Sequence, residues 1–115
     1  MEEKIITAQR IADSLTTRGL FFEQKKMFGG ICFLVNEKML IGANRDNKLL
    51  VRIDPAEEPD LLERSTGISI MQHGTRLAHG YLYVESSLFE SDQELAFWIE
   101  KCLEYNPKAK ASGKK

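Results

Sequence analysis

The chain contains a glycine pair, Gly29-Gly30, which is followed directly by the apolar run Ile31 to Val35. Glycine loses the most backbone freedom on folding and offers no side chain to pack, so a pair within a strand-like run is costly. A bulge, a bend or a close approach of two backbones must offset that cost. We expect the pair to let a strand over residues 24–35 bend where Met27 and Phe28 pack against the first helix.

The chain length predicts one domain. The 115 residues suffice for a single hydrophobic core, and we place the domain at 1–106. The net charge of −1 is unevenly spread: residues 107–115 carry four lysines, whereas residues 1–106 hold 12 basic and 17 acidic side chains. The segment 107–115 has no apolar anchor larger than alanine, so we expect a disordered basic tail.

The sequence predicts a cytoplasmic protein without a cofactor. Cys32 and Cys102 lack C-x-x-C spacing, which argues against a disulfide framework or a zinc site and favours two small core residues. The N-terminus has no basic segment followed by an apolar run, as a signal peptide would. No stretch approaches the roughly 18 apolar residues of a membrane helix.

Hydrophobic spacing predicts the order helix, three strands, helix, two strands, helix. Residues 4–18 carry an amphipathic helical stripe, and Gly19 suits the position after its end. Strands are expected at 24–35, 39–43 and 48–53, joined by turns at 36–38 and 44–47. Such short turns make these strands antiparallel neighbours.

The second half of the chain continues the pattern. Asp54 followed by Pro55 is typical of a helix start, but Pro59 divides the segment into one turn at 55–58 and a helix at 59–64. Strands follow at 68–74 and 76–85, and Ser91 begins a capping box for a last helix that ends at Asn106. The fold class predicted is α+β, a two-layer sandwich of order α-β-β-β-α-β-β-α with an antiparallel sheet.

Several segments resemble the N-terminal domain of the TfoX/Sxy family, the bacterial competence regulators, in the family's order over residues 8–105. They are Lys26-Met27-Phe28-Gly29-Gly30, Phe33, the hairpin around Asn36, Leu49 to Asp54, Gly80 to Val84, and Leu95 with Trp98. The resemblance implies the same element order and a regulatory role without catalytic residues. Glu37 replaces the usual glycine of the first hairpin, Glu57-Glu58-Pro59 is acidic, and the family's second, helical domain is not part of this sequence.

The residues that perform acid–base or nucleophilic chemistry are sparse, so we expect no enzyme and no metal site. His73 and His79 lie near the predicted last two strands, where a hairpin could bring them close, but a zinc site needs three or four ligands. Gly29-Gly30 leads into a strand and lacks the lysine-serine of a phosphate loop. No serine stands in a Gly-x-Ser-x-Gly context.

Two kinds of macromolecular partner stay open. The candidate nucleic-acid contacts are Lys25, Lys26, Lys48, Arg52 and Arg76. The alternation of residues 48, 50 and 52 would place Lys48 and Arg52 on one sheet face, where the tail lysines could add to them. An acidic body repels a polyanion, however, so DNA binding is the alternative and not the favoured function.

A protein partner, or a second copy in a homodimer, is the favoured expectation. Residues 31–35 and 39–43 are apolar on both faces of their strands, which leaves apolar surface if the helices cover only one face. We place the candidate interaction surface at Met27, Phe28, Gly29 and Gly30. The sequence therefore predicts a non-enzymatic regulatory module that binds protein.

Overall fold

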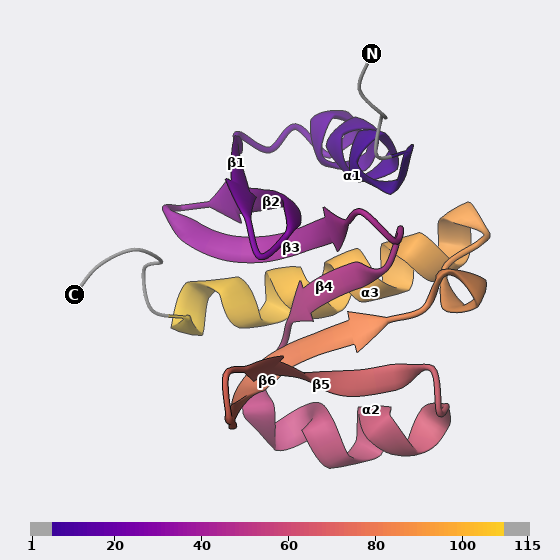
Figure 1. Cartoon of the computed structure of the whole chain (residues 1–115). Helices are drawn as coiled ribbons and strands as arrows, with labels where there is room; N and C mark the ends of the chain where they lie inside the picture. The colour runs from indigo at the N-terminus through magenta and orange to yellow at the C-terminus, as the bar shows by residue number, and fades with distance from the viewer. Residues whose placement is uncertain (1–5, 110–115) are drawn as a thin grey trace.

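A computed structural model of the chain describes residues 6–109, and it has the predicted α+β fold. The elements are α1 (Ile6–Thr17), β1 (Glu23–Met27), β2 (Gly30–Val35), β3 (Lys38–Asn44), β4 (Leu49–Arg52), α2 (Glu58–Arg64), β5 (Ile68–His73), β6 (Arg76–Val84) and α3 (Asp92–Tyr105). The six strands form one antiparallel sheet in the order β1-β2-β3-β4-β6-β5. Figure 1 shows α1 at the β1 end of the sheet, α2 at the β5 end and α3 across the middle.

The segment expected as one bent strand is two strands joined by a tight hairpin. Met27 pairs with Gly30, and the two residues between them, Phe28 and Gly29, have φ angles of 53° and 74°. Positive φ at both central residues is what a type I′ turn requires, and this turn suits the twist of paired strands. Gly29 therefore serves the turn.

Gly30 has a different reason to be glycine. A Cβ atom there would lie 2.0 Å from the carbonyl oxygen of Ala43 and 2.6 Å from the Cα of Asn44, both on the neighbouring strand β3. These are backbone atoms, so no side-chain movement could relieve the contact. Within the glycine pair, the expected close approach of two backbones is present at Gly30 and not at Gly29.

The two following turns lie where the sequence predicts them. Asn36 and Glu37 have φ angles of 57° and 66° and connect β2 to β3. In the next turn the side-chain oxygen of Asn44 accepts hydrogen bonds from the backbone N–H groups of Asp46 and Lys48, at 2.9 and 3.0 Å. Asparagine suits both turns because it tolerates positive φ and bonds nearby backbone.

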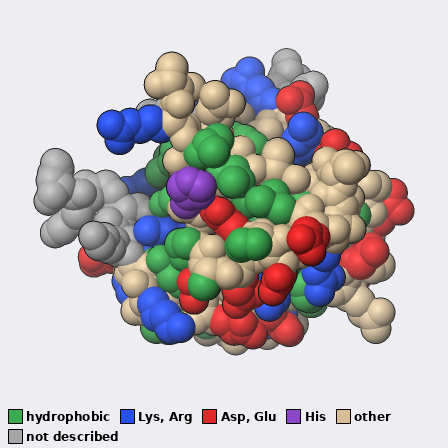
Figure 2. Space-filling model, turned by 90° about the horizontal axis from the view of Figure 1, so that it is seen from below, with side chains coloured by type: hydrophobic (Ala, Val, Ile, Leu, Met, Phe, Trp, Pro, Cys, Tyr) green, Lys and Arg blue, Asp and Glu red, His purple; other side chains and the backbone are tan. Residues whose placement is uncertain are grey.

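The helix predicted to be divided near Pro59 consists of a 3-10 turn at Pro55–Glu57 and the helix α2. The carboxylate of Asp54 caps the turn by accepting from the N–H of Ala56 at 3.0 Å. Glu58, the first residue of α2, is buried; its carboxylate accepts the N–H of Gly80 and lies 3.0 Å from Nδ1 of His79. Figure 2 views the molecule from below, where hydrophobic side chains cluster beside a histidine and acidic side chains gather along one margin.

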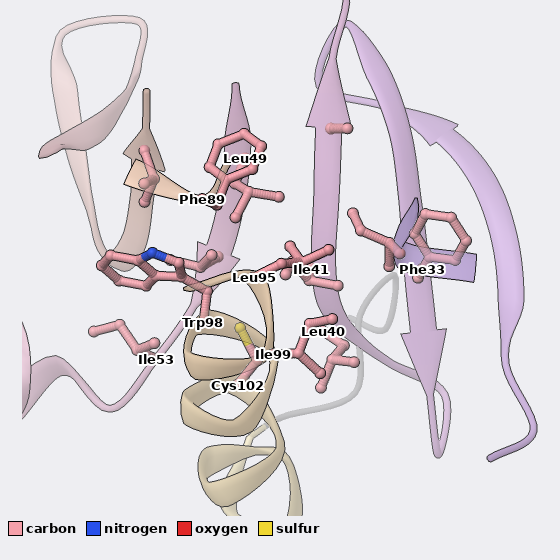
Figure 3. Close-up of a cluster of buried hydrophobic side chains, with 14 of the residues drawn as sticks. Phe33, Leu40, Ile41, Leu49, Ile53, Phe89, Leu95, Trp98, Ile99 and Cys102 are labelled. Atoms are coloured by element: carbon pink, nitrogen blue, oxygen red, sulfur yellow. The ribbon is translucent and has the colours of Figure 1, made fainter. Parts of the chain in front are cut away.

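The main core lies between the helices and one face of the sheet. All three helices contribute to it, and Figure 3 shows the α3 side chains of Leu95, Ile99 and Cys102 among Ile41 and Leu49 of the strands. The helices therefore cover only one face of the sheet.

The predicted capping box begins α3. The Ser91 hydroxyl accepts a hydrogen bond from the N–H of Glu94, and the Glu94 carboxylate accepts one from the N–H of Ser91, both at 3.0 Å.

The end of α3 is tied to the hairpin between β2 and β3. The side-chain amide of Asn106 donates to the carbonyl of Val35 at 3.1 Å, and its oxygen accepts from Asn36 at 3.0 Å. Asn106–Lys108 form a 3-10 turn at the start of the predicted tail. Residues 110–115 of that tail lie outside the described residues.

Candidate interaction surface on the open face of the sheet

The face of the sheet that no helix covers carries its own apolar cluster, and we call it the open face. Its buried members are Cys32, Met39, Leu50 and Met71, and its half-buried members are Met27, Ala78, Tyr81 and Tyr83. Each of the six strands supplies at least one of these residues, and none of them comes from a helix. The apolar residues that break polar alternation in β2 and β3 are thereby explained, since both faces of these strands are packed.

The hairpin between β1 and β2 lies over the open face, so the expectation that Met27 and Phe28 pack against the first helix is wrong. Met27 belongs to the open-face cluster, and its carbonyl accepts a weak hydrogen bond from the Cys32 thiol at 3.9 Å. The ring of Phe28 lies 6.4 Å from that of Tyr81 on β6, at an angle of 58°. Gly30, at the base of this hairpin, is the point where β2 closely approaches the backbone of β3.

Phe28 adopts a conformation that bulky residues rarely take. Its φ of 53° lies in the left-handed region, which costs an L-residue roughly 1–2 kcal/mol. The side chain nevertheless remains 38% exposed, so burial compensates this strain only in part. Local strain of this kind persists where the surroundings fix it and is concentrated at functional sites.

Arg52 connects the aromatic centre of the open face to its basic residues. Its guanidinium carbon lies 5.2 Å from the centroid of the Tyr81 ring. Burial raises the pKa of the Tyr81 hydroxyl, and the nearby positive charge of Arg52 partly counters that rise. Both tyrosines, Tyr81 and Tyr83, therefore keep their hydroxyl protons near neutral pH and present neutral aromatic surface.

The structure brings four of the five predicted nucleic-acid contacts onto the open face. Lys25 pairs with Cys32 and Arg52 with Tyr81, and residues paired across antiparallel strands share a face. Alternation places Lys48 with Leu50 and Arg76 with Ala78.

Lys26 does not join them. It pairs with Ile31, which packs against the helix-side core, so Lys26 lies on the other face of β1.

Charge is segregated between the two layers. The strands carry five basic residues and one acidic residue, whereas α1, α2 and α3 carry three basic and eight acidic residues. The acidic balance of the body, which argued against an anionic partner, therefore resides mainly in the helix layer. The open face itself is basic.

Reactive groups are not assembled elsewhere in the part of the chain that the structure describes. No three metal-binding side chains come together there, and no buried side-chain nitrogen or oxygen lacks a partner. Burial raises the pKa of the Cys32 thiol to about 11 and that of Cys102 to about 12, so both stay protonated and unreactive. His79 pairs with Glu58 on the helix side of β6.

Sequence reasoning missed most of this surface. It named the hairpin residues Met27 and Phe28 but not the strand residues beneath them, among them Met71 and Tyr83. The surplus of apolar residues on both faces of β2 and β3 did indicate an apolar sheet face, and the aromatic alternation of Tyr81 and Tyr83 was the further signal that could have added β6 to it. Gly80 concealed the pattern, because its φ of 92° shifts the alternation and puts Ala78 on the same face as Tyr81.

The described residues thus form a two-layer α+β domain with one helix layer and an open sheet face rich in methionine and tyrosine. The family model of the TfoX N-terminal domain matches residues 16–105, and the chain belongs to that family. A search of curated proteins found no match. Within residues 6–109, no helix has the length and apolar character needed to cross a membrane.

Proposed function

We propose that this domain is a non-enzymatic regulatory module, acting in the bacterial cytoplasm, that docks a protein partner on its open face. The observation that carries the proposal is the exposed, strained Phe28 beside Tyr81, on a sheet face that no helix covers. Membership of a non-enzymatic, regulatory type of domain family supports the same conclusion. The partner is another protein or a second copy of this chain.

The composition of the open face supports a protein partner. The cores of protein interfaces are enriched in aromatic residues, methionine and arginine, and depleted of lysine and acidic residues. Met27, Phe28, Tyr81 and Arg52 provide these side chains, while Lys25 lies further from the hairpin turn on the edge strand β1. Tyrosine and arginine are also the residues that most often dominate binding energy.

The basic character of the open face favours an acidic partner surface. Positive groups around an apolar centre speed association with a negatively charged partner and disfavour basic ones. A second copy would have to place its acidic helix layer against the open face, because two basic faces repel each other. A homodimer formed by two open faces is therefore the less favourable arrangement.

Single-stranded nucleic acid is a second candidate ligand of the open face. The segregation of basic residues to the sheet and acidic residues to the helices favours it. Antiparallel sheets that bind RNA stack bases on aromatic side chains, and Tyr81 with Tyr83 offers such a pair beside Arg52. Binding of this kind weakens steeply as salt rises. Fluorescence anisotropy of labelled oligonucleotides at low and high salt measures it, and no binding at low salt excludes it.

A photo-crosslinking residue at position 28 tests the main proposal in the native cell. The matched control places the same residue at position 93, which is exposed on α3 in the helix layer. We expect a discrete adduct at position 28 that survives nuclease treatment, and no such adduct at position 93. The mass of the adduct separates a second copy from another protein.

Other results of that experiment contradict the proposal. An adduct that nuclease removes assigns the open face to nucleic acid. Equal labelling at positions 28 and 93, or none at position 28, means that the open face docks no protein.

A further inference from the structure

The helix layer contains a hollow of about 240 Å³ that is separate from the open face. It lies where the C-terminus of α2, the start of β5 and the first turns of α3 meet, and it is partly open to solvent. Its volume is below the roughly 300–1,000 Å³ of pockets for drug-sized ligands. A ligand of this hollow would be small, about one ring with a short polar arm.

The inner wall of the hollow is apolar and aromatic. Ile68 and Trp98 are buried there, with Leu88 and Phe97 beside them. The indole Nε1 of Trp98 already donates to the carbonyl of Leu88 at 3.2 Å, so this wall offers the ligand apolar contact and no further donor. The rings of Phe97 and Trp98 meet nearly at right angles, at 83° with centroids 5.0 Å apart, which forms a corner suited to a flat apolar group.

Arg64 places a positive charge at the rim of this corner. Its guanidinium carbon lies 4.8 Å from the centroid of the Phe97 ring, so the aromatic face holds it in position. Arg10 and Arg18 are both paired with carboxylates, Asp92 and Glu100, whereas no ion pair or hydrogen bond of Arg64 occurs within residues 6–109. A guanidinium with free donors is the protein group best matched to a carboxylate.

Glu94 limits the charge of the ligand. It lines the hollow, and its carboxylate accepts from the N–H and the hydroxyl of Ser91 at 3.0 and 3.1 Å. The hydrogen bonds from Ser91 lower the pKa of this carboxyl, which keeps it ionised. A second negative charge on the ligand would be repelled here, so one carboxylate is favoured over two.

We propose that this hollow binds a small monocarboxylate with a flat apolar body. The carboxylate pairs with Arg64, and the ring lies in the corner between Phe97 and Trp98. A free arylalkanoate and the C-terminal aromatic residue of a peptide share this chemistry. Bound there, either ligand would contact α2, β5 and α3 together. The packing of the helix layer of the regulatory domain would then depend on the ligand.

Trp98 is the single tryptophan of the chain and lines this hollow, so its fluorescence responds to a ligand bound there. We would titrate the full chain with 3-phenylpropionate, using the uncharged 3-phenylpropionamide as the control ligand. We expect a saturable change with a Kd on the order of 1 mM, as befits about ten ligand atoms, and at least tenfold weaker binding of the amide. A second titration uses N-acetyl-glycyl-phenylalanine as a model of a peptide C-terminus, with its C-terminally amidated form as the control. Whichever of the two acids binds more tightly, 3-phenylpropionate or the peptide, identifies the source of the ligand.

Variants separate the proposed site from adventitious contact. Arg64→Gln should weaken binding at least tenfold and Arg64→Lys less, while Arg76→Gln, on the open face, should leave it unchanged. Thermal unfolding of each variant checks that it folds, and amide chemical shifts of the wild-type chain locate the binding site independently. The absence of saturable binding up to 10 mM, about ten times the expected Kd, overturns the proposal. Equal binding of acid and amide, or unchanged binding by Arg64→Gln, also overturns it.

Discussion

The two adjacent glycines of the first hairpin should respond very differently to alanine. At position 30 the new Cβ would lie 2.0 Å from the Ala43 oxygen and 2.8 Å from the Ala43 carbonyl carbon. Strands β2 and β3 would have to move apart by about 1 Å or more to reach ordinary contact, with overpacking costs of roughly 1–3 kcal/mol. Each backbone hydrogen bond lost between them adds about 1 kcal/mol. We expect Gly30→Ala to cost about 3 kcal/mol or more.

At position 29 the space is open, because no atom lies within 4 Å of the place that a Cβ atom would occupy. The cost of Gly29→Ala comes from its φ of 74°, about 1–2 kcal/mol, less about 0.4–1 kcal/mol from the reduced freedom of the unfolded chain. The net loss should be about 1 kcal/mol. The two variants differ by one position and by about 2 kcal/mol in the free energy of unfolding.

Urea unfolding followed by Trp98 fluorescence and circular dichroism measures this difference. For urea slopes of roughly 1–3 kcal/mol/M, Gly30→Ala should lower the midpoint by 1 M or more, and Gly29→Ala by about a third of that amount. Equal losses for the two variants, or a greater loss for Gly29→Ala, would refute the close approach of β2 and β3 at Gly30.

Three further predictions concern single groups. Phe28→Asn should change the free energy of unfolding by less than about 1 kcal/mol in urea titrations, because relief of left-handed strain offsets the lost ring contact. The same variant should bind the protein partner of the open face more weakly. Glu58→Ala should cost about 1–3 kcal/mol and speed hydrogen exchange of the Gly80 amide, because that buried N–H loses its acceptor, whereas Glu58→Gln should cost less. The thiols of Cys32 and Cys102 should react with a thiol reagent at pH 8 only after unfolding. Since folding raises their pKa values above 9.0, stability should fall as pH rises beyond about 9, where the unfolded chain loses these protons first.

Much of the fold could be predicted from the sequence, because local signals agree with the tertiary structure. The Ser91 capping box, the Asn36 turn and the Asp54 cap each act within a few residues, so the sequence shows them directly. The first hairpin was the exception. Glycine at position 29 suits a type I′ turn, but phenylalanine is not a residue that its other left-handed position favours, so the local signal for a turn at 28 and 29 is incomplete.

The candidate site was harder to predict, since it depends on contacts between distant strands. Phe28 meets Tyr81 across 53 positions of the chain, and six strands meet in one cluster. The close contact of Gly30 with Ala43 joins two different strands, and no spacing rule shows that contact. The net charge also gave a wrong indication of the charge of the open face, because the acidic total of the body is the sum of a basic sheet and an acidic helix layer.

Oxidative footprinting, in the native cell and on the purified chain, tests most directly whether the open face is covered by a partner. Hydroxyl radicals label Phe28, Tyr81 and Tyr83 on the open face, and Phe21, which is 95% exposed outside it, serves as the control. We expect lower labelling of the three open-face residues in the cell and unchanged labelling of Phe21. Equal labelling of Phe28, Tyr81 and Tyr83 in both samples would contradict a docked partner.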